Sequence, residues 1–515
     1  MKKIKNLITE IKIEKIKKLV TKIKVDAYIR ILIELILGTL LFNVNSIVGI
    51  LFLVIMTTEI IFSNTENCLY MYIFLSFFDE VLQNKYLGGS ISRVLMIVIA
   101  IKLFFNIIRQ KLKPNKKEIG ILGFFLFSFI IGLITYKTIS IEVIIIIFNI
   151  LIFVLFSMNI KLDSKSDIDA FLENLFVTIV IAVLNSILYG ILNNSFLKEI
   201  DGTNIIYRFK GTYEPNFMSL FINLGIISLL AIKGKKISKK LSYILCAIMI
   251  QANIMTVSMT GIATMAIIMI LYFIFNRKNL KKEVKDIGII LMLTIIIFTG
   301  GQIYKKILNN TNNTNFEETE TSLSENKNEE STENLLENEK EENTENLFEN
   351  INEENISNNH IKTPDETNIV NEEKSDLEKR IEFLKEILNN GDLDRFTSGR
   401  LPLAITFMKA SFNRPLINIL FGNDATTKKL FSDYFYGEKY SHNSYMDVLY
   451  NFGIIGFIIS ISYIMYITIK NKYLKNVLND SYYNNTIKLI RIMLLIFAFS
   501  LSLYTKRMFL VFFLL

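Results

Sequence analysis

The stretch SIEVIIIIFNILIFVLFSM, residues 140–158, contains one charged side chain, Glu142. A helix of this length is about as long as the hydrocarbon core of a bilayer is thick, roughly 30 Å. Similar stretches recur along the 515-residue chain, of which 51% is hydrophobic, and the mean hydropathy is +0.38. This composition predicts a membrane protein built from helices and excludes a soluble multidomain enzyme.

The apolar stretches are separated by short polar segments along most of the chain. We therefore predict an all-α polytopic membrane protein with about 13–14 transmembrane helices. The predicted spans lie near residues 27–42, 46–62, 67–82, 91–108, 118–136, 139–157, 168–192, 215–232, 241–257, 260–275, 286–303, 444–469, 485–503 and 505–515.

Basic residues fall in clusters between these stretches. The clusters are residues 1–24, 109–117, 233–240, 277–285 and 470–475. Cytoplasmic loops of membrane proteins carry an excess of Lys and Arg. Counting spans from a cytoplasmic N-terminus places all five clusters on the cytoplasmic side. The two longest loops, 193–214 and 304–443, then fall on the outer side.

Acidic residues are concentrated in one part of the outer loop. Residues 311–380 hold 21 acidic and 6 basic side chains, whereas the remainder of the chain has a net charge of +23. Residues 304–374 are rich in Asn, Glu, Thr and Ser, and such a segment cannot bury enough apolar surface to offset its chain entropy. We predict a disordered acidic insertion that serves as a solvated spacer.

These patterns divide the chain into five parts. Residues 1–26 form a basic cytoplasmic segment, predicted as an amphipathic helix on an anionic membrane surface or, alternatively, as a disordered anchor. Residues 27–303 form a transmembrane bundle and residues 304–374 the spacer. Residues 375–443 begin with an amphipathic pattern and are predicted to be a folded extracytoplasmic loop. Residues 444–515 form the C-terminal transmembrane helices.

Several kinds of site have no counterpart in the sequence. It contains no phosphate-binding Gly-rich loop of the ATPase type and no paired His or Cys at metal-ligand spacing. Cys68 and Cys246 lie in or beside apolar stretches and imply no disulfide framework. The basic clusters alternate with apolar stretches, a pattern that does not indicate a nucleic-acid-binding surface. We expect no metal, no cofactor and no nucleic-acid partner.

Histidine is rare in this chain. His360 lies in the acidic spacer, whereas His442 lies in SHNSYM at the outer end of a predicted span. Histidine is the side chain best suited to exchanging protons near neutral pH. His442 is therefore a candidate catalytic residue, with an interfacial structural role as the alternative.

Two outer segments carry arginine. In IIYRFKGTYEPNF, residues 205–217, Arg208 and Lys210 precede an acidic residue and a Pro-Asn pair. The guanidinium of Arg208 is suited to binding a phosphate through two parallel N–H groups. In the alternative interpretation, Arg208 extends to a lipid headgroup. Arg395 and Arg400 follow the spacer in DRFTSGR. In the alternative interpretation, they are solvated surface residues on a folded loop. Together with His442, these arginines are what an external lipid-pyrophosphate site would require.

Charged residues within the predicted spans are few. Arg30 and Glu34 are four residues apart and predict a pair on one helix face, and Lys102 is interpreted as extending to the membrane surface. Proton-driven transporters show buried carboxylates, internal repeats and charges at the membrane midplane. These are largely missing, but a lipid-glycan flippase remains an alternative function of another class.

The order of motifs in residues 200–460 resembles that of the bacterial O-antigen ligase and polysaccharide polymerase superfamily. It comprises an Arg-x-x-Gly-x-x-x-Pro-Asn block, a Thr-x-Ser break between spans, Ser-Gly-Arg and Gly-Asn in a large outer loop, His-Asn-x-x-x-x-x-Leu, and Gly-x-x-Gly. The matching residues are Arg208, Gly211, Pro215, Asn216, Thr256, Ser258, Ser398, Gly399, Arg400, Gly422, His442, Asn443, Leu449, Gly453 and Gly456.

The resemblance implies an inverting, metal-independent glycosyltransferase of the bacterial inner membrane. Such an enzyme takes a glycan from a polyprenyl pyrophosphate and transfers it to a sugar hydroxyl. A polymerase uses another lipid-linked repeat unit as acceptor, and a ligase uses a terminal acceptor. Arg208 and Arg400 would bind pyrophosphate and His442 would activate or orient the acceptor. Further substrate contacts are expected from Lys210, Glu214, Asn216, Arg395 and Asn443.

The chain departs from the family pattern at Met259. Many members carry a basic residue there, directly after the Ser of the inter-span break. We therefore expect phosphate binding to depend on Lys210 or Arg395 instead. The spacer at 304–370 is also unusually long, and we expect it to have no catalytic part.

Overall fold

The structure is a computed structural model that describes residues 27–41, 46–84, 89–111, 116–136, 141–160, 164–201, 204–299, 400–422, 443–470, 483–501 and 503. The contacts given below lie within one compact unit, formed by residues before 298 and after 375. The predicted N-terminal segment, the acidic spacer, most of the loop 375–443 and the span at 505–515 lie outside the described residues.

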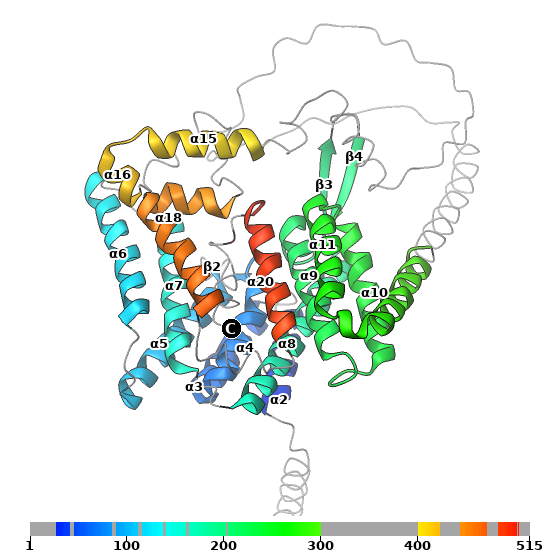
Figure 1. Ribbon diagram of the computed structural model, residues 1–515. Coiled ribbons are helices and arrows are strands. Elements are labelled where there is room, and N and C mark those ends of the chain that lie inside the picture. Colours follow the sequence, from blue (N-terminus) through cyan, green and yellow to red (C-terminus); the bar gives the residue numbers. More distant parts are fainter. Residues whose placement is uncertain are drawn as a thin grey trace, which may run out of the picture. The chain divides into compact units, whose positions relative to one another are not determined.

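The described chain is mostly helical (Figure 1). Its α-helices are α2 (Ala27–Leu41), α3 (Ser46–Phe62), α4 (Thr65–Ser76), α5 (Ile91–Gln110), α6 (Lys116–Tyr136), α7 (Ile141–Asn159), α8 (Lys165–Leu192), α9 (Pro215–Ile232), α10 (Lys239–Met255), α11 (Met259–Phe275), α15 (Arg400–Phe412), α16 (Leu416–Phe421), α18 (Ser444–Lys470) and α20 (Asn484–Ala498). A 3₁₀ turn, η2 (Arg277–Asn279), precedes a further helix at residues 280–299.

Four of the described helices are long and apolar enough to cross a membrane. They are Ile91–Gln110, Lys165–Leu192, Pro215–Ile232 and the first part of α18, Ser444–Ser462. Other apolar helices are shorter than 18 residues, among them Ile47–Phe62 and Met259–Phe275. The helices coincide with the predicted apolar stretches, although α4 ends at Ser76 rather than at residue 82. Acidic side chains at 79 and 80 oppose continuation, since the C-terminal end of a helix carries partial negative charge.

Two antiparallel hairpins interrupt the helices, and the periodicity of the sequence did not predict them. A short one pairs β1 (Gln83–Asn84) with β2 (Gly89–Ser90). A longer one pairs β3 (Phe196–Asp201) with β4 (Asn204–Phe209), and Leu197 lies opposite Arg208 in its register. The predicted outer loop 193–214 is therefore largely a β-hairpin that leads into α9.

Helix α9 is the most buried helix described, because other helices surround it. All of its residues except Asn216 are buried, and it contacts α8, α10, α11 and α20. A helix that is apolar on every side requires such an environment. Gly225 permits the close packing, since a Cβ atom there would lie 3.1 Å from Val183 and 3.2 Å from Met249.

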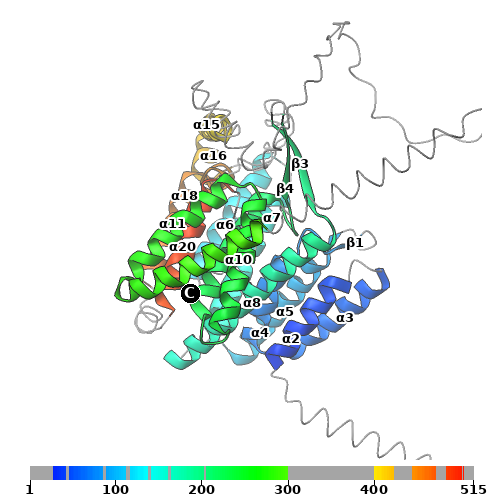
Figure 2. The same ribbon diagram turned by 90° about the vertical axis from the view of Figure 1, so that its right-hand side faces the viewer.

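The two ends of this bundle differ in character. At one end, the α9–α10 turn supplies Lys235 and Lys236, which pair with Glu173 of α8 at 3.8 and 3.2 Å, and Tyr483 donates to Glu173 at 2.8 Å. The β3–β4 hairpin lies at the opposite end (Figures 1 and 2). Two basic clusters predicted for one side, 233–240 and 277–285, do meet, because Lys233 pairs with Glu283.

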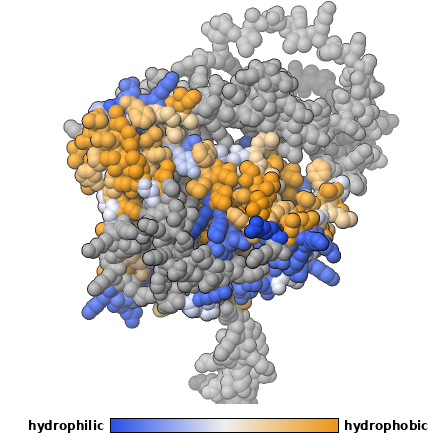
Figure 3. Space-filling view, viewed as in Figure 1, coloured by the Kyte–Doolittle hydropathy of each residue, from blue (hydrophilic) through white to orange (hydrophobic). Residues whose placement is uncertain are grey.

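Many large apolar side chains face outward from the helices. Examples are Phe105 of α5, Ile134 of α6 and Met292 of the helix at 280–299, which are 63, 72 and 65% exposed. On the face shown in Figure 3, apolar surface covers α6 and α11, and hydrophilic residues gather towards the ends. Exposed apolar area of this extent marks a surface for lipid or a partner.

Helices α15 and α16 and the first part of α18 lie at the same end as the β3–β4 hairpin (Figures 1 and 2). Helix α18 kinks at Gly453, where φ is +68°. A Cβ atom there would lie 2.5 Å from the carbonyl oxygen of Leu420, and one at Gly422 would lie 2.3 Å from that of Asn451. Both positions need glycine, because the backbone at the end of α16 lies directly against the backbone of the kink in α18.

The charged side chains within the predicted spans have partners. Arg30 lies 3.7 Å from Glu34, as predicted, and 2.9 Å from Glu59 of α3. The amine of Lys102, which was interpreted as extending to the membrane surface, reaches the C-terminal end of α3. Its Nζ atom donates to the carbonyl oxygens of Ile60 at 2.5 Å and of Ser63. These are C-terminal carbonyls of α3, where a cation is favoured.

Candidate functional site

Two segments that are distant in the sequence meet at Arg208. The first contains β4, the loop 210–214 and the N-terminus of α9. The second is the break between α10 and α11, residues 256–258. The guanidinium of Arg208 joins them, since its Nε atom donates to the carbonyl oxygen of Thr256 at 3.1 Å and its Nη2 atom donates to Oδ1 of Asn216 at 2.9 Å.

The amide of Asn216 is the centre of this arrangement. Its Oδ1 atom accepts from Arg208 and also from Oγ of Ser258 at 2.9 Å, and its Nδ2 atom donates to Oε1 of Glu214 at 2.6 Å. Arg208, Glu214 and Asn216 are all half-buried. One amide therefore fixes a cation and a carboxylate on its two sides while keeping both within reach of solvent. We name Arg208, Glu214, Asn216, Thr256 and Ser258 the arginine site.

The break between α10 and α11 is tightly folded. Thr256 and Ser258 are buried, and Val257 between them adopts φ +49°. A β-branched residue rarely takes this left-handed conformation, which costs about 1–2 kcal/mol. The turn is held by Oγ1 of Thr256, which donates to the carbonyl oxygen of Asn253 at 2.6 Å, and by the capping of α11 through Ser258. Such strain persists where its surroundings fix the backbone, and it gathers at functional sites.

The helix ends add partial positive charge to the arginine site, which also holds the cation of Arg208 and the carboxylate of Glu214. Pro215 is the first residue of α9 and Met259 the first of α11, so both helices begin beside Asn216 and Ser258. The N-terminus of a helix carries partial positive charge and exposes unpaired N–H groups. Two N-termini and a guanidinium next to one another form a favourable environment for an anion.

Buried contacts hold the loop 210–214 in place. Oγ1 of Thr212 donates to the carbonyl oxygen of Phe77 at 2.7 Å, and the hydroxyl of Tyr213 donates to that of Ser76 at 3.0 Å. Both acceptors lie at the C-terminal end of α4. Gly211, at φ +57°, allows the chain to turn between them and β4. Sequence reasoning missed Thr212 and Tyr213, and only their position beside Glu214 could have suggested them.

A layer of buried polar side chains lies beneath the arginine site. Oγ of Ser219 donates to Oδ1 of Asn253, whose Nδ2 atom donates to Oδ1 of Asn223 at 3.1 Å. Asn223 in turn donates to the carbonyl oxygen of Gly261 at 3.0 Å. A Cβ atom at Gly261 would lie only 1.6 Å from Oγ of Ser219. Glycine is required here because α9 and α11 approach each other so closely.

The other predicted site residues have different places. Lys210 is half-buried, and its backbone N–H donates to the carbonyl oxygen of Ser195 at 3.0 Å. Oδ1 of Asn443 accepts from the N–H groups of Tyr445 and Met446 at 3.0 and 3.2 Å, so this predicted substrate contact caps α18.

Three predicted site residues are described in part or not at all. Arg400 is the first residue of α15, and its side chain lies outside what the structure describes. His442 and Arg395 lie outside the described residues, so their proximity to Arg208 stays a prediction.

Another arginine, Arg414, was not singled out in the sequence. Its guanidinium lies 4.4 Å from the ring centroid of Tyr450, and its Nη1 atom donates to the carbonyl oxygen of that residue at 3.0 Å. Its Nε atom donates to the carbonyl oxygen of Ser411 at 3.1 Å. Arg414 thus joins the end of α15 to α18, which is a structural role.

A second group of charged side chains lies at the opposite ends of α9 and α11. Nζ of Lys233 lies 2.7 Å from Asp286 and 3.2 Å from Glu283. The hydroxyls of Tyr243 and Tyr272 donate to Asp286 and Glu283, each at 2.7 Å. These five residues, named the lysine cluster, satisfy one another and connect four helices. We interpret the lysine cluster as a structural element that holds these four helices together.

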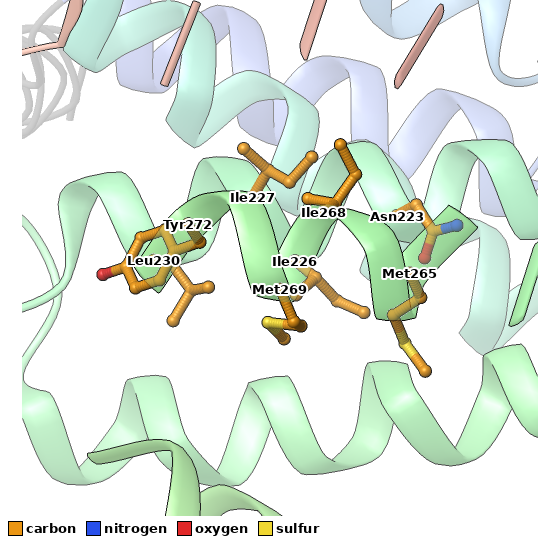
Figure 4. Close-up of a pocket in the computed structure, with 8 residues that line it drawn as sticks. All are labelled: Asn223, Ile226, Ile227, Leu230, Met265, Ile268, Met269 and Tyr272. Atoms are coloured by element: carbon orange, nitrogen blue, oxygen red, sulfur yellow. The ribbon is translucent and has the colours of Figure 1, made fainter. Parts of the chain in front are cut away.

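The pocket shown in Figure 4 is apolar and lies between α9 and α11. Its polar lining residues are Asn223 and Tyr272, which bond to Gly261 and Glu283 respectively. No reactive group therefore faces the pocket, and it is a packing gap between the arginine site and the lysine cluster. Within the part of the chain that the structure describes, no group of three or more His, Cys, Asp or Glu is placed to hold a metal ion.

Comparison with models of known protein families, with curated proteins and with solved structures gave no match.

Proposed function

We propose that this protein is an integral membrane glycosyltransferase that polymerises polyprenyl-pyrophosphate-linked glycan repeat units into a surface polysaccharide. The observation that carries the proposal is the position of Arg208 between the N-termini of α9 and α11. Two segments of the family-like motif order, the Arg-x-x-Gly-x-x-x-Pro-Asn block and the Thr-x-Ser break, contact each other there through Asn216, Ser258 and Thr256.

The chemistry of the donor fits this arrangement. A polyprenyl pyrophosphate combines a long apolar chain with a multiply charged anion at the membrane surface. The exposed apolar helix surfaces suit the chain, and the arginine site suits the anion. Because Arg208 is half-buried, its charge is screened less than it would be in open water.

In the proposed reaction, an acceptor sugar hydroxyl attacks the anomeric carbon of the donor glycan. The bond between that carbon and the pyrophosphate oxygen breaks, and the lipid pyrophosphate departs with the electron pair. Negative charge then grows on the leaving oxygen, and Arg208 with the two helix N-termini stabilises it. His442 and Arg400 are proposed to complete the site from the outer loop.

The proposed setting is the bacterial inner membrane, with 13–14 spans and residues 304–443 extracytoplasmic. The described helices support the membrane location alone, because four of them are long and apolar enough to cross. Helices α9, α10 and α11, which follow one another in the chain, alternate in direction, because the C-terminal end of α10 meets the N-terminal ends of α9 and α11. The arginine site then faces outward, at the end opposite the lysine-rich turns.

The test is turnover of a purified polyprenyl-pyrophosphate-linked repeat unit by the full chain in lipid nanodiscs, with a metal chelator present. We expect longer lipid-linked glycans and release of lipid pyrophosphate. Movement of the lipid-linked glycan across vesicles without any bond formation would contradict the proposal and favour a flippase. Transfer that stops on chelation would contradict the metal-independent mechanism.

A further inference from the structure

We propose that Glu214 is the general base that takes the proton from the acceptor hydroxyl during glycan transfer. This inference rests on the proposed function and adds a catalytic residue to it. It starts from an irregularity at the beginning of α9, where a glutamate occupies the capping position and its side chain makes no capping hydrogen bond.

The local sequence does not explain glutamate at this position. Asn, Asp, Ser and Thr are the residues that cap helices well, and each does so by accepting from the first N–H groups. Pro215, the next residue, has no N–H to offer. A carboxylate near a helix N-terminus gains about 0.3–1 kcal/mol from the helix dipole, and an aspartate would gain both this and the cap. A residue that stabilises the helix less than aspartate would is expected where function requires that residue.

The geometry directs the Glu214 carboxylate towards the arginine site. Its Oε1 atom accepts from Nδ2 of Asn216 at 2.6 Å, and Asn216 binds Arg208 through its other amide atom. Among the residues that the structure describes, none forms a hydrogen bond or ion pair with Oε2 of Glu214. One oxygen thus orients the carboxylate, and the second is available to a ligand.

The surroundings keep this carboxylate in a fixed place. Tyr213, the preceding residue, is 2% exposed and its ring lies 5.0 Å from that of Phe221 in an edge-to-face arrangement. Its hydroxyl bonds to the end of α4. The charged side chains on the neighbouring strand and loop are Arg208 and Lys210, and the α10–α11 break contributes only uncharged residues. A general base must be held rigidly within hydrogen-bond reach of the proton that it removes.

The proposed step balances. The acceptor O–H proton moves to Oε2 of Glu214 as the acceptor oxygen forms its bond to the anomeric carbon. The bond from that carbon to the pyrophosphate breaks, and its electron pair leaves with the lipid pyrophosphate, beside Arg208. The proton on Glu214 then passes to water, which returns the carboxylate to its ionised form for the next transfer.

The test compares Glu214→Gln, Glu214→Ala and the matched control Glu80→Gln in the nanodisc turnover assay. Glu80 is a half-buried carboxylate in the turn after α4, outside the proposed machinery. Loss of a general base costs ~10²–10⁴-fold in rate, so we expect Glu214→Gln to fall by that factor although its amide oxygen can still accept from Asn216. The control is expected to stay within a factor of ~3, as surface changes usually do.

Chemical rescue makes the test decisive. Added formate is expected to restore part of the activity of Glu214→Ala, because a small carboxylate can occupy the space left by the side chain, and to leave Glu214→Gln inactive. Near-normal turnover by Glu214→Gln would overturn the inference, as would failure of formate to rescue Glu214→Ala in a folded protein. Both results require an active parent protein. An inactive parent would instead overturn the proposed function.

Discussion

Oγ of Ser258 donates a hydrogen bond of 2.9 Å to Oδ1 of Asn216, a residue 42 positions earlier in the chain. The same oxygen accepts from Arg208. Ser258 also caps α11, and Asn216 lies in the first turn of α9. The bond therefore connects the N-terminal ends of two helices and holds the amide that binds the guanidinium of Arg208.

The first prediction concerns Arg208. Arg208→Lys keeps the charge but cannot donate from two nitrogens in a fixed plane to Thr256 and Asn216. Removing such a stabilising donor typically lowers turnover by ~10²–10³-fold, and we expect that loss with retained folding in detergent. The measurement is the release of lipid pyrophosphate from a purified lipid-linked repeat unit. Arg93→Lys, an exposed arginine at the start of α5, is the control; an equal loss in both variants would contradict the assignment.

His442 and Arg400 are predicted to act with Arg208 on the basis of sequence. His442→Ala and Arg400→Lys are each expected to abolish polymer or ligated glycan, because one would lose the side chain that orients the acceptor and the other a bidentate phosphate contact. Glycan chain length on gels measures the effect in cells. His360→Ala, in the acidic spacer, is the matched control and should be silent. Normal chain length in His442→Ala would return that residue to a structural role.

Gly261 tests the contact between α9 and α11. In Gly261→Ala, the new methyl group would collide with Ser219, and overpacking of this kind costs about 1–3 kcal/mol. The loss should appear as a lower midpoint of denaturation in detergent. Adding Ser219→Gly to Gly261→Ala should recover part of the stability.

The control for the Gly261 substitution is Gly123→Ala in α6, where a Cβ atom would have no neighbour within 4 Å. Replacing an exposed helix glycine by alanine is expected to be neutral or to stabilise by up to ~1 kcal/mol. If Gly261→Ala behaved like Gly123→Ala, α9 and α11 would have to lie further apart than the structure places them.

The lysine cluster provides a stability prediction. The side chains of Lys233 and Asp286 are 6% and 8% exposed, so Lys233→Ala would leave buried carboxylates without their cation. Removing one partner of a buried pair costs ~3–5 kcal/mol, and we expect a folding defect of that size, measured by denaturation and by the yield of monodisperse protein. Lys240→Ala, an exposed residue at the start of α10, should have little effect. Combining Lys233→Met with Asp286→Asn and Glu283→Gln should recover stability if charge, and not packing, is the cause.

Membrane orientation can be tested with single cysteines, after Cys68 and Cys246 have been replaced. Asn194→Cys lies beside the hairpin and Lys240→Cys lies at the opposite end of the bundle, and both positions are exposed. An impermeant maleimide should label Asn194→Cys in intact spheroplasts and label Lys240→Cys only after lysis, because lysine-rich loops remain cytoplasmic. The reverse pattern would place the arginine site on the cytoplasmic face and remove the basis for an extracytoplasmic transferase.

Parts of the candidate site could be predicted from sequence and parts could not. Arg208, Glu214 and Asn216 are close in the chain, and the motif order listed Thr256 and Ser258 among the family-like positions without predicting a contact. The interaction itself depends on side-chain directions at the ends of α9 and α11, which periodicity does not specify. The capping of α18 by Asn443 was not predicted, because it depends on where that helix begins. The partners of Lys102 could not be predicted either, because the carbonyls that it binds belong to another helix.

The sequence by itself determined the helical segments and their apolar surfaces. Each long apolar run has to satisfy its own backbone hydrogen bonds wherever water is absent, so run length and composition are sufficient to predict helix. Only the tertiary structure decided that α9 is enclosed by other helices, that the loop before it forms a β-hairpin, and that Gly261 allows α11 to approach Ser219. These features depend on contacts between residues far apart in the chain, and the energy of such contacts is set by the fit of both partners. The sequence pattern of either segment alone therefore does not determine the energy of such a contact.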